Sequence, residues 1–377
     1  MKVLFLTNIP APYRVKFFSE LGNLVDLTVL YELHNASNRD SSWKAEDVEL
    51  TYKEVFLNGI QVVADGSISF DVFSYLNDEY DFIIIGTHGT PTAKLAMFYM
   101  RARGIPYILN LDGMLSDELN QKSLLIRLMR KFLFQGANAY LTSGKDTDCY
   151  LQKLGIDISS KCYHYHFSSV DDSDIVDNND FDIKMHIKES LGFKEKAVVM
   201  CVARFIPGKG IDMLLRAFAS LKRQDTALVI IGGVGTVYDS VLSGMEDEIK
   251  SHIYFPGFMS KEKLTKYYRA SDVFVLPTHH DGWGLVINEA MANGLSIITT
   301  DKCGAGLEII KDDENGFLVK DNDEAGLGHK INYLLNNKNI RQYMSENNIK
   351  IAHQYTIDMM VKDHVKHFRA LKLVGEK

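Results

Sequence analysis

The chain has 377 residues, which is more than one ordinary domain holds and enough for two. Hydrophobic residues make up 46% of it and charged residues 24%, a composition typical of globular proteins and unlike that of disordered or membrane-embedded chains. The formal net charge of -7 gives no reason to expect a nucleic acid as the main partner.

The first strand-like run of the chain, Lys2–Thr7, is followed by a break at Pro10 and is too short for a signal peptide. No apolar run approaches the length that crosses a bilayer. The four cysteines are far apart and form no CxxC pair, so neither a zinc finger nor a disulfide framework is indicated. We therefore expect a cytoplasmic protein, at most in contact with the inner face of the cell membrane, with reduced and mostly buried thiols.

In the first half, short β-branched runs alternate with longer amphipathic stretches, a pattern typical of parallel α/β architecture. Helices are expected at Pro91–Arg103 and Leu119–Phe134. The strands expected there are Lys2–Thr7, Val25–Tyr31, Asp81–Gly86, Ile105–Asn110 and Ala139–Thr142.

Residues 168–183 interrupt the alternation, because they are acidic and polar and show no periodicity. We therefore place a linker at 173–190, between a domain at 1–172 and a second domain at 191–355, and expect residues 356–377 to form a helix that packs back on the first domain. The second set of expected strands is Ala197–Ala203, Ala227–Ile231, His252–Phe255, Val273–Leu276, Ser296–Thr299 and Gly316–Val319.

In open parallel sheets, ligands bind just past the carboxyl ends of strands, and two such domains place a ligand cleft between them. The segment after the first strand of the second domain contains Arg204, Lys209 and Gly210, and a helix is expected from about Ile211. Two cations before a helix start suit a diphosphate. The alternative is a turn with two solvated cations. The glycine spacing does not fit a Walker loop or a dinucleotide fingerprint.

A second segment, His279–Ala290, follows the strand Val273–Leu276 and opens a helix. Its glycines expose backbone N–H groups near the helix start, which suits an anion. The carboxylates of Asp281 and Glu289 can accept hydrogen bonds from sugar hydroxyls. The alternative is that Asp281 forms a turn and Glu289 is an ordinary exposed helix residue.

The histidines of 164–166 and 279–280 lack a third or fourth spaced ligand, so we expect no metal site. The helix at Lys122–Phe134 mixes cations with large apolar residues and could rest on an anionic membrane. We favour the alternative, in which its apolar side packs on the domain's own sheet.

Together these motifs resemble those of the retaining family 4 glycosyltransferases of bacterial surface polysaccharide biosynthesis, which have the GT-B fold. Their second domain carries the pattern V-G-R-x-x-x-x-K-G and, further on, an acidic residue, G-F-G-L and a second Glu eight positions after the first. This chain has Val202-Ala203-Arg204 with Lys209-Gly210, then Phe255-Pro256-Gly257-Phe258, Ala270-Ser271-Asp272-Val273, and Asp281-Gly282-Trp283-Gly284-Leu285 with Glu289. Its opening segment, residues 8–14, resembles the first loop of such enzymes.

The resemblance implies two Rossmann-like domains that face each other across a cleft. It implies that Arg204 and Lys209 bind the diphosphate and stabilise charge on the leaving group, that Asp281 and His88 lie beside the transferred sugar, and that Glu289 binds the ribose. The other residues implied at the site are Gly284, Leu285, Gly257, Phe258 and Trp283 on the donor side, and Asn8 and Asp112 on the acceptor side.

The activity implied is a hexosyl- or related glycosyltransferase that moves a sugar from a nucleotide-diphosphate sugar to a hydroxyl of a saccharide or lipid-linked saccharide. The anomeric configuration is retained, and no cofactor or metal is required. Two departures from the family pattern are Asp281 in place of the usual Glu and Ala203 in place of Gly. The first of these leaves the sugar contact open.

Other functions compatible with the fold are a glycoside phosphorylase, a sugar-nucleotide epimerase and a non-catalytic partner subunit. The epimerases lack the paired acidic residues, and a non-catalytic subunit is expected to have lost Arg204, Lys209 or Glu289, which are all present. The sequence leaves open the donor base and sugar, the acceptor, the oligomeric state and any membrane association.

Overall fold

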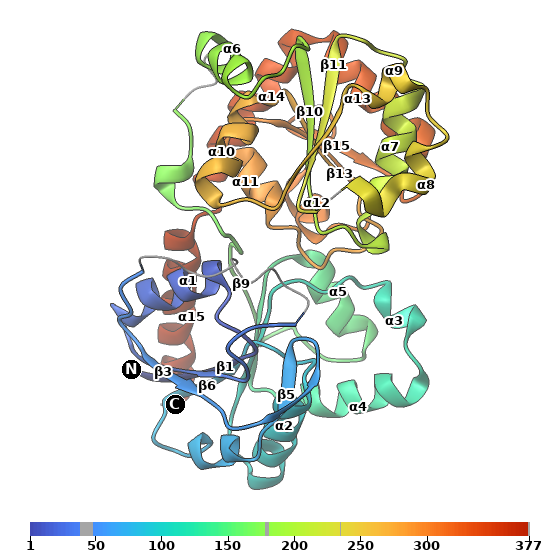
Figure 1. Cartoon of the computed structure of the whole chain (residues 1–377). Coiled ribbons are helices and arrows are strands. Elements are labelled where there is room, and N and C mark those ends of the chain that lie inside the picture. The colour runs from blue at the N-terminus through green and yellow to red at the C-terminus, as the bar shows by residue number, and fades with distance from the viewer. Residues whose placement is uncertain (38–47, 178–180, 234, 376–377) are drawn as a thin grey trace. The chain divides into compact units, whose positions relative to one another are not determined.

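The computed structural model describes residues 1–37, 48–177, 181–233 and 235–375. The chain divides into two compact units, the first formed by Met1–Ser169 with Tyr355–Lys377 and the second by Val170–Gln354. Each unit is a parallel sheet with helices packed on it (Figure 1). This confirms the α/β fold class expected from the alternation of short and long apolar runs.

The first unit contains a seven-stranded sheet of order β3-β2-β1-β6-β7-β8-β9, in which every neighbouring pair is parallel. The strand order reverses between β1 and β6, which makes the carboxyl ends of these two strands a topological switch point. The strands are β1 (Lys2–Thr7), β2 (Asp26–Tyr31), β3 (Lys53–Phe56), β6 (Phe82–Ile85), β7 (Ile108–Leu111), β8 (Ala139–Thr142) and β9 (Cys162–His164), with a separate antiparallel hairpin of β4 (Ile60–Val63) and β5 (Gly66–Ile68).

The helices of the first unit start at residues that suit helix N-termini. Pro12 and Pro91 occupy first-turn positions, where the missing N–H costs nothing, and the Thr90 hydroxyl accepts from the Ala93 N–H at 3.3 Å. The helices are α1 (Pro12–Gly22), η1 (Asp71–Tyr75), α2 (Pro91–Arg103), α3 (Glu118–Gln121), α4 (Leu124–Gln135), α5 (Lys145–Lys153) and α15 (Ile357–Gly375). The last of these packs against α1 (Figure 1).

The second unit contains a six-stranded parallel sheet of order β12-β11-β10-β13-β14-β15, with its switch point between β10 and β13. Its strands are β10 (Ala197–Val202), β11 (Thr226–Ile231), β12 (Ile253–Gly257), β13 (Val273–Leu276), β14 (Ser296–Thr300) and β15 (Gly316–Val319). Its helices are η2 (Asp172–Asp174), α6 (Phe181–Ser190), η3 (Pro207–Lys209), α7 (Ile211–Ser220), η4 (Gly235–Tyr238), α8 (Asp239–Leu242), α9 (Asp247–Lys250), α10 (Lys261–Ala270), α11 (Val286–Ala292), α12 (Gly304–Ile309), α13 (Glu324–Asn336) and α14 (Lys338–Ala352).

The linker expected at 173–190 is wrong for its second part, because residues 181–190 form helix α6, which packs on α10. Lys188 fixes this helix to the sheet through an ion pair of 2.6 Å with Asp272, the residue before β13. Residues 178–180 of the expected linker lie outside the described residues. The single helix expected at Leu119–Phe134 is wrong as well. Two helices, α3 and α4, occupy this segment, and Ser123 caps the start of the second.

The loops after β10 and β13 are fastened to each other through one backbone oxygen. The Gly208 carbonyl accepts hydrogen bonds from the Thr278 hydroxyl at 2.9 Å, the His279 N–H at 3.0 Å and the His280 N–H at 3.2 Å. Three donors on one carbonyl hold the two segments in register, and the side chains that follow each strand therefore lie at the same edge of the sheet.

Gly210 is required where this loop enters α7. Its φ is +63°, and a Cβ atom built there would lie 2.0 Å from the Pro277 carbonyl oxygen. Gly208, two residues earlier, has open space around the same position.

We predict that Gly210→Ala destabilises the protein by at least about 1–2 kcal/mol, since an alanine must adopt the left-handed conformation and also displace Pro277. Gly208→Ala is the matched control and should be close to wild type. The measurement is equilibrium unfolding in urea. Equal stability of the two variants would show that the β10 loop is not held as tightly as described.

Candidate functional site

The centre of the candidate site is an ion pair between Lys209 and Asp281, at the switch point of the second unit. The Lys209 Nζ lies 2.5 Å from Asp281 Oδ2, and the two side chains are 13% and 22% exposed. Lys209 ends η3, in the loop after β10, and Asp281 follows β13. The structure thus joins two motifs that the sequence analysis treated separately. A pair this well buried is costly to break on one side only.

Asp281 is itself held by the backbone of the next strand connection. Its N–H donates to the Lys302 carbonyl at 2.9 Å, and its carbonyl accepts from the Gly304 N–H at 3.0 Å. A Cβ atom on Gly304 would lie 2.0 Å from the Gly282 carbonyl oxygen, so the two loops approach as closely as their backbones permit. The backbone of Asp281 is therefore fixed in position before any ligand arrives.

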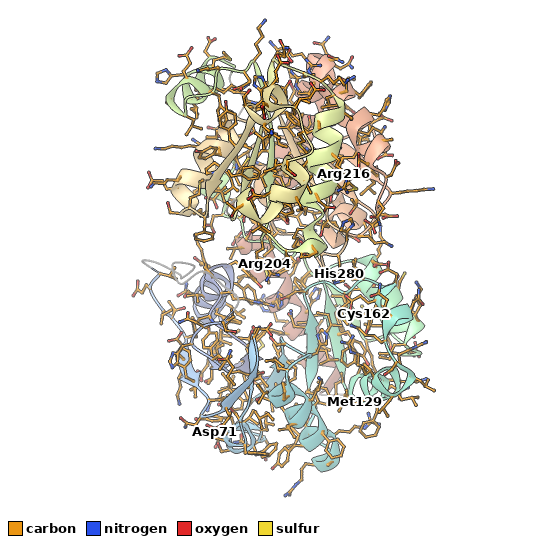
Figure 2. The ribbon with its side chains drawn as sticks, turned by 45° about the vertical axis from the view of Figure 1, so that its right-hand side comes forward. Asp71, Met129, Cys162, Arg204, Arg216 and His280 are labelled. Carbon is orange, nitrogen blue, oxygen red and sulfur yellow. The ribbon has the colours of Figure 1, made fainter. Side chains whose placement is uncertain are left out.

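Arg204 supplies a second cation in the same loop and is labelled in Figure 2. Its side chain is half-buried, and its guanidinium makes no hydrogen bond or ion pair within the described part of the chain. A guanidinium can contact a phosphate through two parallel N–H groups. Of the two cations expected to bind a diphosphate, Lys209 already has an anionic partner and Arg204 has none among the described residues.

Glu289 lies on α11 and is half-buried. Its Oε2 accepts a hydrogen bond of 2.9 Å from the Tyr268 hydroxyl, on α10. Burial, together with the neighbouring Glu289 carboxylate, raises the pKa of Tyr268 well above its ordinary value. The phenol therefore stays protonated and keeps one Glu289 oxygen oriented.

Trp283, expected on the donor side, is only 4% exposed, and its indole N–H donates to Asn288 Oδ1 at 3.0 Å. Its side chain thus packs and fixes the start of α11, and the donor-side role implied for Trp283 stays a prediction. Gly284 has a φ of +89°. The backbone N–H groups of Gly284 and Leu285 have no acceptor among the described residues.

At the end of β12, Gly257 has a φ of +83° with open space around its Cα, and the Phe258 side chain is 45% exposed. Two glycines that follow β11, Gly233 and Gly235, each pack against an aromatic ring. A Cβ on Gly233 would lie 2.5 Å from the Phe205 ring, and one on Gly235 would lie 2.6 Å from the ring of Phe255. These glycines allow the backbone to lie flat on the rings.

His279 is paired with a residue that the sequence analysis missed. Its Nδ1 lies 2.5 Å from Asp321 Oδ1, and both side chains are mostly buried. Asp321 comes shortly after β15, so the rule that functional side chains follow parallel strands could have found it. The His279–Asp321 pair borders the loop that carries Asp281.

In the first unit, Asn8 and His88 follow β1 and β6 and so lie at its switch point. Asn8 Nδ2 donates to Asp65 at 3.2 Å, and the hydroxyls of Thr7 and Thr87 are 3.4 Å apart. The His88 ring meets Phe134 edge-on, with centroids 5.4 Å apart.

The environment of His88 keeps its imidazole neutral. The side chain has a partly exposed edge, but the atoms packed around the ring, with Arg130 and Lys94 nearby, lower its pKa to about 3. A neutral imidazole offers one hydrogen-bond donor and one acceptor and carries no charge. The role implied for His88 is contact with an uncharged sugar. A neutral imidazole suits this role, which stays a prediction.

Asp112, expected on the acceptor side, already has several partners. Its Oδ1 accepts from the Tyr165 hydroxyl at 2.6 Å and from Asn110 Nδ2 at 2.7 Å, and its Oδ2 pairs with Arg14. Arg14 is buried among aromatic rings and, against the effect of burial, Asp112 raises the pKa of its guanidinium. This arrangement favours a structural role for Asp112 in tying α1 to β7.

Glu32 is a buried acid that the sequence analysis did not select. It follows β2 and accepts from the Ser67 N–H at 2.9 Å and from the Thr90 hydroxyl. Burial raises its pKa to about 7, although these hydrogen bonds oppose the shift. Its position directly after a strand is the signal that could have found it.

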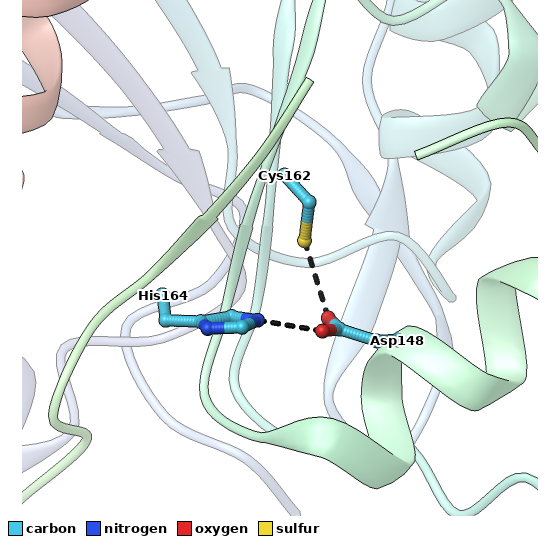
Figure 3. Close-up of side chains that lie close together, drawn as sticks. All are labelled: Asp148, Cys162 and His164. Carbon is cyan, nitrogen blue, oxygen red and sulfur yellow. Dashed lines mark hydrogen bonds and ion pairs between the residues drawn. The ribbon is translucent and has the colours of Figure 1, made fainter. Parts of the chain in front are cut away.

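Three possible metal ligands come together at the edge of the first unit, where the sequence analysis expected no metal site (Figure 3). His164 Nε2 lies 2.6 Å from Asp148 Oδ2, and Cys162 Sγ lies 3.1 Å from Asp148 Oδ1. The third ligand that the histidines lacked in sequence is supplied by α5. Of the four thiols, Cys201 and Cys303 are buried as expected, whereas Cys149 is exposed.

Helix α4 buries Leu133 and Phe134 but presents most of its apolar side chains outward, which contradicts the expectation that its apolar side packs on the sheet. Leu125 is 77% exposed, and Met129, also exposed, is labelled in Figure 2. We define the α4 patch as the exposed apolar residues of this helix with Phe98 of α2: Leu124, Leu125, Ile126, Leu128, Met129, Phe132 and Phe98. No helix in the described part of the chain has the length and hydropathy that crossing a bilayer requires.

Comparison with known proteins finds a family model that matches most of the second unit. Residues 183–351 match the family model described as "Glycosyl transferases group 1". An uncharacterised glycosyltransferase of Methanocaldococcus jannaschii is 31% identical over 160 residues, 42% of this chain and 44% of the relative. The capsular polysaccharide biosynthesis glycosyltransferase CapM of Staphylococcus aureus is 29% identical over 185 residues, 46% of this chain and 45% of the relative. The chain thus aligns with about half of the length of these relatives.

Solved structures match over nearly the whole chain. Sucrose-phosphate synthase from Thermosynechococcus elongatus aligns with a TM-score of 0.76 and 15% identity, covering 99% of this chain and 100% of the other. Anabaena HepE, solved in complex with UDP, aligns with a TM-score of 0.77 and 16% identity, covering 98% and 100%. At this identity the likeness concerns the fold, and it confirms the GT-B fold class.

Proposed function

We propose that the chain transfers a sugar from a nucleotide-diphosphate sugar to a hydroxyl of a saccharide or lipid-linked saccharide, because residues 183–351 match the group 1 glycosyltransferase model. The transfer retains the anomeric configuration, as the resemblance to the retaining family implies. The observation that carries the proposal is the Lys209–Asp281 ion pair at the β10–β13 switch point, with Arg204 in the same loop as Lys209.

The leaving group determines what the cations do. Transfer breaks the bond between the anomeric carbon and a phosphate oxygen, and the nucleoside diphosphate leaves with an added negative charge. Arg204 and Lys209 stabilise that charge as it develops, and the acceptor hydroxyl forms the new bond on the same face while its proton passes to the leaving oxygen. Fixed charges aimed at a developing anion are commonly worth several kcal/mol.

The ion pair gives Asp281 a second task beside its contact with the sugar. In the free protein its carboxylate compensates the Lys209 ammonium at 2.5 Å. A bound diphosphate competes for the same ammonium, and Asp281 then turns a freed oxygen toward the sugar ring as positive charge develops there. Glu289, held by Tyr268, binds the ribose hydroxyls.

Neither the segment with Arg204 and Lys209 nor the segment with Asp281 and Glu289 identifies the base or the sugar of the donor. A relative from Mycolicibacterium smegmatis, 30% identical over 41% of this chain and 43% of its own length, is named a GDP-mannose-dependent mannosyltransferase. HepE was solved with UDP and with UDP-glucose. We therefore propose GDP- and UDP-hexoses as the donors to test first.

The proposed transfer predicts that Lys209→Ala lowers the kcat of the folded protein by about a hundredfold or more, because one stabilising charge is removed from the transition state. Release of nucleoside diphosphate from GDP- and UDP-hexoses in the presence of saccharide acceptors is the measurement. Lys311→Ala, which removes a lysine side chain that is 71% exposed in the same unit, is the matched control. A folded Lys209→Ala variant with near-native turnover would contradict the assignment.

The Lys209–Asp281 pair predicts opposite effects on product binding and on turnover for Asp281→Asn. The loss of the competing carboxylate should tighten nucleoside diphosphate binding several-fold. The lost contact with the sugar should lower kcat about ten- to a hundredfold. Calorimetry with the nucleoside diphosphate and turnover on the whole donor separate the two effects.

Glu289→Gln is the comparison variant for this experiment, and we expect it to weaken binding of the nucleoside diphosphate. The proposed division of labour would be wrong if Asp281→Asn weakened that binding as much as Glu289→Gln does.

We propose further that the α4 patch contacts an anionic membrane, where a lipid-linked acceptor would reside. Its most exposed side chains, Leu124 and Leu125, are 69% and 77% exposed, and Arg127 and Lys131 lie on the same helix. Contiguous apolar side chains flanked by cations are typical of helices that lie in a membrane interface. The basic residues add attraction to anionic headgroups.

The double substitution Leu125→Glu with Leu128→Glu should lower binding to vesicles that contain phosphatidylglycerol by at least about tenfold. Two leucine side chains that become buried in the membrane interface contribute roughly 3 kcal/mol or more to the free energy of binding. Co-sedimentation measures the binding. Ile60→Glu, at an apolar residue that is 76% exposed on the β4–β5 hairpin, should leave the binding unchanged. Equal loss in both variants would indicate a general charge effect and contradict docking through α4.

A further inference from the structure

The cluster of Asp148, Cys162 and His164 lies in the first unit and takes no part in the proposed transfer. Cys162 and His164 are alternate residues of β9, so their side chains point to the same face of the sheet. Helix α5 covers that side and supplies Asp148. As Figure 3 shows, the thiol and the imidazole approach the same carboxylate from two directions.

The three side chains are positioned by their surroundings. The Thr142 hydroxyl donates to Asp148 Oδ1 at 2.8 Å and also lies 3.3 Å from Cys162 Sγ. Thr142 ends β8, the strand that pairs with β9, and is fully buried. Such hydrogen bonds to a carboxylate are the contacts that orient ligands around a metal.

The backbone of β9 is fixed from its other side. Tyr163, which points away from the cluster, packs on the His367 ring of α15 with centroids 5.3 Å apart. The His367 Nε2 lies 2.6 Å from the His164 carbonyl oxygen. The short edge strand is therefore held in place, and the spacing of its two ligands is largely preformed.

The ligand atoms offered by the three residues all lie within 4.8 Å of one another. Zinc bonds of about 2.0–2.3 Å in a tetrahedral site place ligand atoms roughly 3.3–3.8 Å apart, so small side-chain movements would bring all three onto one ion. The set of one sulfur, one nitrogen and one oxygen suits Zn²⁺ and is foreign to Mg²⁺ and Ca²⁺, which take oxygen ligands.

We propose that Asp148, Cys162 and His164 bind one Zn²⁺ ion, with the fourth position of the tetrahedron taken by water. The His164 side chain is 59% exposed, which leaves the cluster open toward solvent. On binding, the thiol loses its proton to solvent and becomes the thiolate ligand, and the imidazole binds in its neutral form. No electron is transferred. The ion would cross-link α5 to the edge strand β9.

The cluster has a matched control within the same helix. Cys149 follows Asp148 directly, but its side chain is exposed and takes no part in the cluster. Replacing Cys149 therefore removes a thiol of the same chain without touching the proposed ligands. His164 is the ligand whose replacement disturbs the fold least, because its side chain is the most exposed of the three.

The test is a calorimetric titration of the full chain with ZnCl₂ after removal of metal by a chelator. We expect one ion per chain for the wild type and for Cys149→Ser. Cys162→Ser and His164→Ala should each weaken binding at least about tenfold. Addition of Co²⁺ should produce thiolate-to-cobalt absorption in the wild type and Cys149→Ser and none in Cys162→Ser. MgCl₂ should give no binding at this cluster.

Absence of zinc binding to the wild type would overturn the proposal, as would affinities of Cys162→Ser and His164→Ala that equal the wild-type value. A far-ultraviolet circular dichroism spectrum of each metal-free variant establishes that it is folded before titration. Because the readout is metal binding, the result is independent of whether the chain transfers a sugar.

Discussion

The ion pair between Lys209 and Asp281 is the interaction on which the arrangement of the second unit's loops depends. Its two charges are largely removed from water, and each would be costly without the other. The surrounding backbone meets this requirement. Gly208 binds the loop after β13 through three hydrogen bonds, and Gly210 and Gly304 permit contacts that no larger residue could make. These glycines thus allow the close backbone packing that positions Lys209 and Asp281 for their ion pair.

In the proposed transfer, the same pair affects how a donor binds. A diphosphate would meet Arg204, whose guanidinium has no partner among the described residues, and an ammonium already shared with a carboxylate. Binding to both cations would require exchange of one anion for another at Lys209, which would favour a diphosphate over weak or singly charged anions. The released carboxylate would then be free beside the sugar, where positive charge would develop. In that proposal, Asp281 neutralises the Lys209 ammonium in the free protein and stabilises positive charge on the sugar in the transition state.

The two units use their switch points differently. In the second unit, charged groups gather after β10 and β13 and suit a phosphate-bearing ligand. In the first unit, the residues after β1 and β6 include Asn8 and Thr87, and His88 stays neutral because its pKa is lowered to about 3 by burial and nearby cations. Uncharged donors and acceptors of hydrogen bonds suit sugar hydroxyls. The charges of the first unit are instead used internally, as in the buried contact between Arg14 and Asp112.

The sequence by itself determined the α/β architecture and most strands of both sheets, because alternating apolar runs and helical periods are local properties that each segment carries alone. It also located Arg204, Lys209 and Asp281 in loops after strands and Glu289 on the helix that follows, because parallel strands place their following residues at one edge. The edge strands β3 and β9 of the first sheet, of four and three residues, were missed, because such short strands show no clear period.

Only the tertiary structure decided which of these residues meet. Lys209 and Asp281 are 72 positions apart in sequence, and Arg14 and Asp112 are 98 apart. No local pattern encodes such contacts, since they depend on the order of strands in the sheet. For the same reason the sequence analysis expected the apolar side of α4 to pack on its sheet and found no third ligand beside His164. Burial and neighbours are properties of the packed chain, and they exist only once distant segments have been brought together.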